Sequence, residues 1–334
     1  MARQRETRKT IASLHSGDEP IEEPSLSDLS NLTREEQALL DDAWAEIPVD
    51  MRRRLVTLMG EKADEDFQLD FTAVFRRGLQ DMDAAVRQAC VEGLWEDESI
   101  TLIRPFLALL GDENHAVQAC AATALARFVL QGELGYLSAE RYQEIVQALV
   151  EKIQDPDSPL SVRRRAVEAI AYSSDDRVRD IIARAYEDAS VEMRISAVFA
   201  MGRSADDYWR ESVRGELWSE NPALRYEAAR AAGELADPQA VERLVMLLGD
   251  GDREVREMAI WALGQIGGSA AKRALKAVIN GDQPVPLRRL ARDSLAEMNL
   301  LDETSDSFLV DATLYDSLEE DNDDEERQVF EEDE

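Results

Sequence analysis

The chain has 334 residues, of which 44% are hydrophobic, and its 70 acidic residues outnumber 38 lysines and arginines to give a net charge of −32. This composition supports a substantial buried core, but its acidity disfavours general attraction to phosphate backbones or anionic lipid. The sequence has no apolar run of about 18 residues, and its beginning lacks the apolar core of a secretory signal, so we expect a cytoplasmic protein without a membrane or nucleic-acid partner.

The first 65 residues are expected to contain a flexible arm and then a helical hairpin. Residues 1–30 combine a short basic start with serines, prolines and acids, which cannot bury enough apolar surface to become ordered. In residues 31–65, Thr33 stands where a helix N-cap is expected, Glu36 follows three positions later, and Pro48 suits the first turn of a second helix. We therefore predict a hairpin that caps the structure after it.

Residues 66–301 contain a repeat. An apolar residue, followed in all but one case by arginine, recurs at Val86, Val117, Val162, Met193, Leu224, Val255 and Leu287. The intervals between these anchor residues are 31, 45, 31, 31, 31 and 32, so a single unit of about 31 residues recurs along the chain. The longest interval contains 14 additional residues, most of which we assign to a loop at 131–140 and the rest to a longer turn at 154–161.

The anchors belong to amphipathic helices. Four residues after each anchor stands a small residue, and eight residues after it a residue that is apolar: Cys90 and Leu94, Ala121 and Leu125, Ala166 and Ile170, Ala197 and Met201, Ala228 and Ala232, Ala259 and Leu263, Ala291 and Leu295. These offsets follow one face of an α-helix, and small residues on it allow a neighbouring helix to approach closely. With an apolar helix upstream, each unit is an antiparallel helical pair that becomes stable only by stacking on the next.

The segment "GDGDREVREMAIWALGQIGG", residues 249–268, shows the repeat most completely. Strings of this kind make residues 66–300 resemble HEAT repeats, of the short type found in phycobilisome-lyase-like HEAT families. The tetratricopeptide and ankyrin signatures are missing. The resemblance implies an all-α fold, a right-handed α-solenoid of about seven HEAT-like helical hairpins with the N-terminal hairpin as a cap.

Two polar positions recur with the anchors. The aspartates five residues before them are Asp81, Asp112, Asp157, Asp188, Asp250 and Asp282, and the arginines directly after them are Arg87, Arg163, Arg194, Arg225, Arg256 and Arg288. Aspartate in this turn can accept N–H groups at the helix start, and arginine can fork onto a carboxylate of its own or an adjacent unit. The HEAT resemblance implies a structural ladder. Gln118 and Ser219 interrupt it, and Asp155 is an alternative to Asp157.

The sequence shows no constellation for catalysis. His15 and His115 do not precede glutamate, so the di-iron site of HEAT-type deoxyhypusine hydroxylases is not expected, and no histidine, cysteine or acid cluster has metal-ligand spacing. We therefore predict no catalytic residue, no metal and no cofactor. The leading interpretation is a non-catalytic scaffold. The alternative implied by the family resemblance is an accessory lyase-like factor that modifies a protein or attaches a chromophore.

A binding surface is predicted on the second helices, which line the concave side in HEAT-type solenoids. Two and six residues after the anchors, the middle units carry Ile195, Phe199, Tyr226, Arg230 and Trp261. Aromatic residues and arginine are the types that anchor protein interfaces, so we expect this concave patch to bind another protein or a peptide. The competing interpretation is that these side chains pack against each other.

Residues 302–334 form an acidic tail, with sixteen aspartates or glutamates and one arginine. We expect the tail to be mostly disordered, because its net charge of −15 opposes compaction. A second hypothesis is that the segment "SFLVDATLYDSL" docks as a short helix on a partner or on the concave face.

Overall fold

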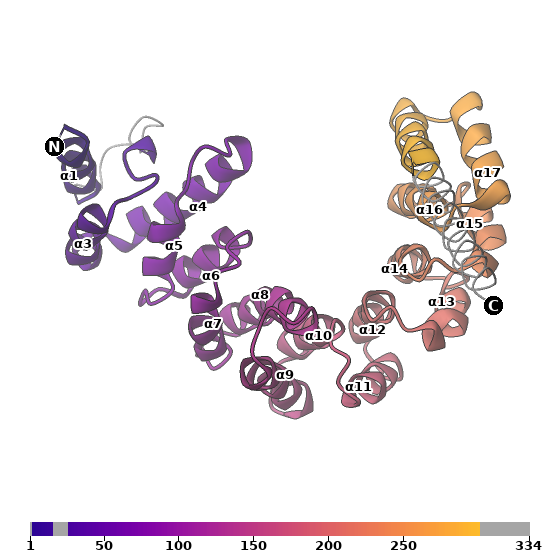
Figure 1. The fold of residues 1–334 in the computed structure, drawn as a ribbon, viewed down its shortest axis with the longest axis horizontal. Coiled ribbons are helices and arrows are strands. Elements are labelled where there is room, and N and C mark those ends of the chain that lie inside the picture. The colour runs from indigo at the N-terminus through magenta and orange to yellow at the C-terminus, as the bar shows by residue number, and fades with distance from the viewer. Residues whose placement is uncertain (1, 16–25, 301–334) are drawn as a thin grey trace, which may run out of the picture. The chain divides into compact units, whose positions relative to one another are not determined.

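The computed structural model describes residues 2–15 and 26–300, and the regular elements in these ranges are all helices (Figure 1). They are α1 (Ala2–Leu14), α3 (Arg34–Ala43), η1 (Trp44–Glu46), α4 (Val49–Glu65), α5 (Thr72–Gly78), α6 (Ala84–Gly93), η2 (Ile100–Leu102), α7 (Ile103–Leu109), α8 (His115–Glu133), α9 (Ala139–Gln154), α10 (Leu160–Ile170), α11 (Arg177–Tyr186), α12 (Val191–Arg203), η3 (Asp207–Trp209), α13 (Arg210–Glu216), α14 (Pro222–Glu234), η4 (Pro238–Ala240), α15 (Val241–Leu247), α16 (Arg253–Ile266) and α17 (Gly268–Asn280), followed by helical residues 285–300. Within these ranges no helix is both long and apolar enough to cross a bilayer. The predicted acidic tail lies outside the described residues.

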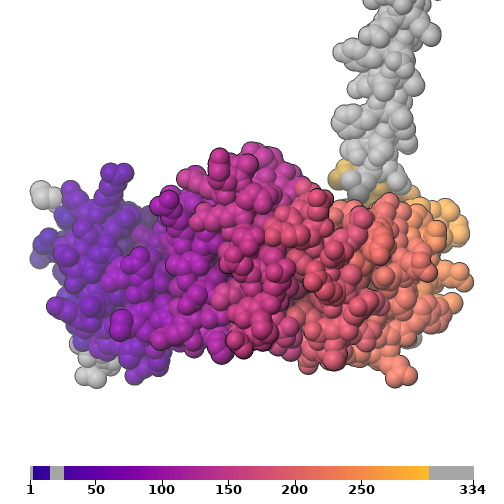
Figure 2. Space-filling view, turned by 90° about the horizontal axis from the view of Figure 1, so that it is seen from below, coloured from indigo at the N-terminus to yellow at the C-terminus, as the bar shows by residue number. Residues whose placement is uncertain are grey.

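The chain divides into two compact units, an N-terminal unit (Met1–Ala200) and a C-terminal unit (Met201–Glu334). In the N-terminal unit, second helices α4, α6, α8 and α10 contact one another in order, and α6, α8 and α10 each also pack on a first helix. In the space-filling view, the surface of this unit changes from indigo to magenta in chain order (Figure 2). In the C-terminal unit, α14 contacts α16 and α15 contacts α17. Each unit is thus built as an α-solenoid of stacked helical pairs, which confirms the predicted fold class.

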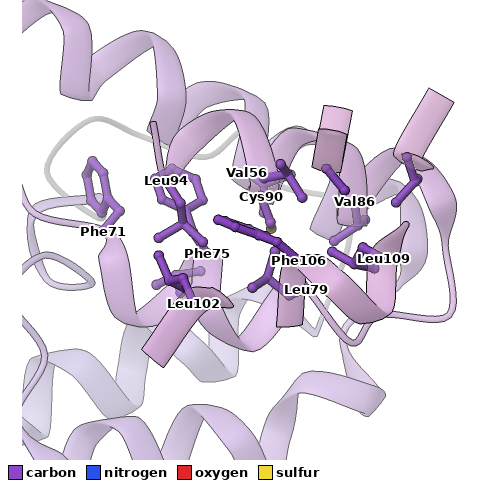
Figure 3. Close-up of a cluster of buried hydrophobic side chains, with 14 of the residues drawn as sticks. Val56, Phe71, Phe75, Leu79, Val86, Cys90, Leu94, Leu102, Phe106 and Leu109 are labelled. Atoms are coloured by element: carbon purple, nitrogen blue, oxygen red, sulfur yellow. The ribbon is translucent and has the colours of Figure 1, made fainter. Parts of the chain in front are cut away.

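The seven anchors of the repeat are all buried, with exposed fractions between 0% and 3%. The small residues four positions later are fully buried as well. In the N-terminal unit, Val86 and Cys90 of α6 and Leu94 directly after it lie in one apolar cluster with Phe75 of α5 and Phe106 of α7 (Figure 3). Because each such side chain contributes roughly 1.5–3 kcal/mol when removed from water, contact between pairs holds the stack together.

The predicted flexible arm is a helix over part of its length, which corrects the sequence-based expectation for residues 2–14. Thr7, Ile11 and Leu14 of α1 are buried, and α1 contacts α3. The Arg3 guanidinium donates to the carbonyl of Ser30 over 2.6 Å. The buried face of α1 contains only two aliphatic residues, Ile11 and Leu14, among charged neighbours, so the sequence pattern gives little sign of a packed helix. In the structure α1 covers α3, the first helix of the hairpin. Residues 16–25 lie outside the described residues.

The hairpin α3–α4 occupies residues 34–65, where a helical pair was expected. Its start has the predicted geometry: the Thr33 hydroxyl accepts the Glu36 amide, and the Glu36 carboxylate accepts the Thr33 amide. This reciprocal capping box satisfies two backbone donors that would otherwise lack a partner at the helix start.

The 14 additional residues lengthen two helices instead of forming the predicted loop at 131–140. Helix α8 has 19 residues and α9 has 16, and between them lie only residues 134–138. The buried residues Phe128 and Val129 continue the apolar face of α8 past Leu125, so packing favours an extended helix. The Tyr142 hydroxyl of α9 donates to the Glu133 carboxylate over 2.8 Å and joins the two helices at this end.

Glycines allow close helix approach in the C-terminal unit. A Cβ added to Gly202 would lie 2.8 Å from the Ala231 Cα, and one added to Gly233 would lie 3.0 Å from the Ala262 Cα. Both glycines stand nine residues after an anchor. The second helices of neighbouring units therefore touch backbone to backbone at this position of the repeat.

Candidate functional site

The ladder predicted from the repeat is formed by an arginine of one unit and the aspartate of the next. Arg87 donates to both carboxylate oxygens of Asp112, over 2.8 and 2.7 Å. Arg225 does the same with Asp250, over 2.8 Å in each bond. These pairs are bidentate and largely buried, so they orient adjacent helical pairs in a defined way.

The same pairing begins in the hairpin before the repeats. Arg52, directly after Met51 of α4, lies 2.8 Å from the carboxylate of Asp81, and the Trp44 indole N–H donates to that carboxylate over 2.6 Å. Asp81 also accepts the amide of Asp83 two residues later. The hairpin thus joins the stack through the same contact that joins later units.

The interruption at Gln118 has a direct structural reason. Arg87 donates to the carbonyl of Asp81 in its own turn as well as to the next carboxylate, and the shorter Gln118 amide reproduces only the bond to its own turn, at the Asp112 carbonyl. In the longer turn before α10, Asp155 accepts the amide of Asp157, whose side chain is exposed. Asp155 therefore has the turn role that the alignment assigned to Asp157.

The remaining ladder residues occupy varied settings. Asp188 accepts the amide of Ser190, and Asp282 is exposed. The Arg194 guanidinium lies 5.6 Å from the centroid of the Tyr186 ring, and Arg256 donates to the carbonyl of Asp250. Within the described residues, the buried Nε atoms of Arg163 and Arg288 have no hydrogen-bond partner.

Electrostatics at the ladder are those of structural ion pairs. The hydrogen bonds to Asp112 raise the pKa of Arg87 despite its burial. Burial alone would raise the pKa of Asp112, but the Arg87 fork and the Asn114 amide outweigh it, so the pKa of Asp112 is lowered. Arg225 likewise lowers the pKa of Asp250. The carboxylates of Asp112 and Asp250 are therefore charged and hydrogen-bonded to arginine, which is consistent with a structural role.

The predicted concave patch is divided between the units and partly used for packing. Ile195 and Phe199 belong to the N-terminal unit and are half-buried. In the C-terminal unit, Arg230 is 8% exposed and donates to Glu227 and Glu234 of its own helix. Both contacts hold the guanidinium of Arg230 on the helix surface, so Arg230 is engaged within the unit.

The two aromatic residues of the patch in the C-terminal unit are also half-buried. A Cβ added to Gly233 would lie 2.7 Å from the Trp261 ring, so this ring covers the glycine of the preceding second helix. Burial raises the pKa of Tyr226. For Trp261 this placement favours the packing interpretation.

A more open surface lies on the second helices of the N-terminal unit, around Trp95. A hollow of about 450 Å³ is bordered by Val91, Glu92, Trp95, Cys120, Thr123, Ala124, Ala126, Arg127, Leu130 and Tyr172. A hollow of about 250 Å³ between α4 and α6 also has Trp95 in its wall. We call the two together the Trp95 groove. Trp95 is 62% exposed and Leu130 is 39% exposed, so the groove presents apolar side chains to solvent.

The repeat explains why the groove opens at Trp95. Nine residues after the anchors the chain carries Trp95, Ala126, Ala171, Gly202, Gly233, Gly264 and Ala296. Small residues at this position let the next second helix approach, as at Gly233, whereas the first unit has an indole there. This exception is present in the aligned repeats, at an offset different from offsets two and six, on which the predicted patch rests. Glu92 and Thr123, which line the groove, do lie at offset six, so the predicted face is the one that opens.

Arg127 supports the 450 Å³ hollow from α8. Its guanidinium lies 5.3 Å from the centroid of the Phe106 ring and 5.0 Å from that of Phe128, and Nη1 donates to the Trp95 carbonyl over 2.7 Å. Burial lowers the pKa of Arg127. The hydrogen bond from Arg127 therefore fixes the position of the Trp95 backbone in the wall of the hollow.

The cysteine in the groove is not an activated nucleophile. Burial, with a smaller contribution from Glu92, raises the pKa of Cys120 to about 12. At neutral pH the thiol is therefore protonated, and it has little nucleophilic character. Within the described residues, no group of three or more histidines, cysteines or acids is arranged to hold a metal.

A third, wider hollow of about 1280 Å³ also includes Trp95 in its wall and is strongly acidic. Its charged residues are Asp41, Asp64, Asp70, Glu96, Asp97, Glu98, Arg76 and Arg77. Both arginines are ion-paired, Arg76 with Asp97 over 2.7 Å and Arg77 with Asp41 over 3.3 Å. The apolar Trp95 groove therefore has a negatively charged border.

Comparison with known families gives a match in the C-terminal part of the chain. Residues 216–296 match the family model of HEAT repeats. This part of the chain is therefore similar to HEAT repeats, and the stacked helical pairs of the described residues have the α-solenoid fold. A search of curated protein sequences gave no significant match.

Solved structures align with this chain at low sequence identity. The complex of CpcE and CpcF of phycocyanin lyase from Nostoc sp. PCC7120 aligns with 70% of this chain and 94% of its own, at 19% identity and a TM-score of 0.50. Human deoxyhypusine hydroxylase aligns over 80% and 97%, at 20% identity and a TM-score of 0.34. Importin beta aligns over 88% and 44%, at 14% identity and a TM-score of 0.47. The likeness to the lyase complex concerns the fold alone.

Proposed function

We propose that this protein is a non-catalytic scaffold or adaptor that binds another protein or a peptide in the Trp95 groove. The observation that carries the proposal is an indole, 62% exposed, in the walls of adjoining hollows at a position where the other units have alanine or glycine. Large exposed aromatic side chains beside an apolar hollow are typical anchors of protein interfaces. The protonated Cys120 thiol supports a binding role over a catalytic one.

The concave patch predicted from the sequence remains a second part of the proposal. Phe199 stands six residues after its anchor, as Glu92 and Thr123 do, and Ile195 stands two residues after the same anchor; all four belong to second helices of the N-terminal unit. The half-buried side chains of Ile195 and Phe199 extend the proposed binding face along that unit. A role in partner binding has less support for Tyr226, Arg230 and Trp261, because Arg230 and Trp261 already pack within the C-terminal unit.

The test is affinity purification of the full chain from its native host, comparing Trp95→Ala with Trp218→Ala. Trp218 is a matched control, since it is 63% exposed and lies in the C-terminal unit. We expect the wild type and Trp218→Ala to recover the same partner in equal yield and Trp95→Ala to lose at least about nine tenths of it. Circular dichroism checks that both variants are folded. Equal recovery with Trp95→Ala would refute the groove as the binding site.

A further inference from the structure

We infer that the occupant of the Trp95 groove is a basic amphipathic segment of a partner protein, with apolar side chains in the hollows and lysines or arginines on the acidic border. This inference rests on the proposed function and adds the chemistry of the partner. It follows from which charges around the groove are already neutralised within the unit.

Five carboxylates around the groove are exposed to solvent: Asp64, Asp70, Glu92, Glu96 and Glu98. Of the cations in the same walls, Arg76 and Arg77 are ion-paired with Asp97 and Asp41. Arg127 donates to the neutral Trp95 carbonyl and so contributes one positive charge against the five exposed carboxylates. The border therefore has an excess of negative charge directly beside apolar surface. A partner that buries Trp95 brings its own flanking charges against this border, and like charges there oppose association.

This electrostatic argument also disfavours the acidic tail as the occupant. Residues 302–334 carry a net charge of −15, and "SFLVDATLYDSL", the most apolar part of the tail, contains two aspartates and no cation. Repulsion from Glu96 and Glu98 would oppose docking of this segment. A segment with apolar residues on one face and lysine or arginine on the other satisfies both parts of the groove.

Apolar walls distinguish this groove from a purely charged surface. Trp95 and Leu130 offer exposed apolar area, while Glu92 and Thr123 of the second helices border it. A basic peptide without apolar side chains would interact only with the acidic border, where salt screens the electrostatic attraction. Tight binding therefore requires both features in one segment.

The test uses three fluorescein-labelled synthetic peptides of about 14 residues and the full chain, with fluorescence anisotropy as the readout. The first peptide places leucines on one helical face and lysines on the other. The second replaces every lysine with glutamate, and the third keeps the lysines but replaces every leucine with serine. We expect the first peptide to bind at least about tenfold more tightly than either of the others.

Matched variants separate the groove from the general acidity of the chain. Trp95→Ala should weaken binding of the first peptide about tenfold or more, and Trp218→Ala should leave it within about twofold. Thr123→Trp, which fills the hollow from an exposed position, should weaken it as well. Glu96→Gln with Glu98→Gln should weaken binding several-fold, whereas Glu211→Gln with Glu220→Gln, an equal change of charge at exposed positions, should not.

Each contrary outcome has a defined meaning. Equal binding of the first peptide to the wild type and Trp95→Ala, equal loss with both glutamine pairs, or no binding overturns the inference. Tighter, Trp95-dependent binding of the glutamate peptide overturns the basic partner but leaves the scaffold function standing. Retention of the native partner by Trp95→Ala overturns the proposed function itself.

Discussion

At the scale of single residues, the repeat shows that one arginine side chain can donate hydrogen bonds both within its own turn and to the next repeat. Arg87 donates to the carbonyl of its own turn and to the carboxylate of the next unit. Gln118 retains the first bond and lacks the reach for the second. The alignment of repeats showed that Gln118 breaks the series, but only the contacts reveal that the break removes the bond between units and leaves the turn intact.

The ion pair between Asp83 and Arg53 allows the contribution of a charged carboxylate to stability to be tested by changing the pH. The Arg53 guanidinium, helped by the Val86 and Ala85 amides and opposed by burial, lowers the pKa of Asp83 to about 2. Because the pKa is lower in the folded state than the usual value near 3.9, this carboxylate stabilises the fold above pH 4, and the contribution is lost as pH falls towards 2.

We expect Asp83→Asn to make the loss of stability between about pH 5 and pH 2 shallower than in the wild type. Asparagine remains a good N-cap for α6, so the substitution removes the charge while keeping the cap. Urea unfolding at a series of pH values measures the slope. Asp42→Asn, at an exposed position on α3, is the control and should leave the slope unchanged. An unchanged slope in Asp83→Asn would contradict the assignment.

At the scale of elements, the packing of second helices depends on the residue nine positions after each anchor. Glycine at 202 and 233 brings neighbouring helices into backbone contact, while Trp95 stands at the end of α6 beside an open groove. The same position of the repeat thus influences whether neighbouring helices approach closely or leave an open groove.

Gly233→Ala should destabilise the protein although alanine favours helix. The added Cβ would lie 3.0 Å from the Ala262 Cα and 2.7 Å from the Trp261 ring, and such overpacking costs about 1–3 kcal/mol. Gly215→Ala is the control, because nothing lies within 4 Å of its Cβ position in α13. We expect that control to raise the free energy of unfolding by about 0.5–1 kcal/mol. Urea denaturation of both variants tests this, and equal effects of the same sign would disprove close packing at Gly233.

At the scale of the whole molecule, each helical pair is stabilised by packing on its neighbours. The outermost pair lacks one neighbour, so an additional element that covers its free side contributes to stability. Helix α1 provides such a cover for α3 by burying Ile11 and Leu14. Without it, the buried Glu36 carboxylate of α3 would lose the hydrogen bond from the Thr7 hydroxyl and the cover over that end of the unit. A solenoid with a covered end unfolds less readily from that end than one without a cover.

Leu14→Ser should therefore release α1 and increase hydrogen exchange in α3. Leu14 is 3% exposed, and we expect its loss to cost about 2–4 kcal/mol locally. Ala12→Ser, at an exposed position of the same helix, is the control and should leave exchange in α3 unchanged. Mass-spectrometric hydrogen exchange resolves the two helices. Protection of α3 equal to that of the wild type would show that α1 is not a cover.

Sequence alone determined the helical pairs and their inward faces. Because helix period and repeat length are local properties, Val86 through Leu287 could be identified as buried before any contact was known. The capping box of Thr33 and Glu36 was equally local. The tertiary structure decided where surface is left open, since this depends on side chains that meet across different units.

Three features illustrate what only the tertiary structure decided. Helix α1 is ordered because α3 provides the surface that buries its short apolar stripe. Arg230 is withdrawn from the predicted patch because two glutamates of its own helix bind it. The Trp95 groove exists because the space between α4, α6 and α8 is not filled by their side chains, and no periodicity within one helix specifies the space between helices.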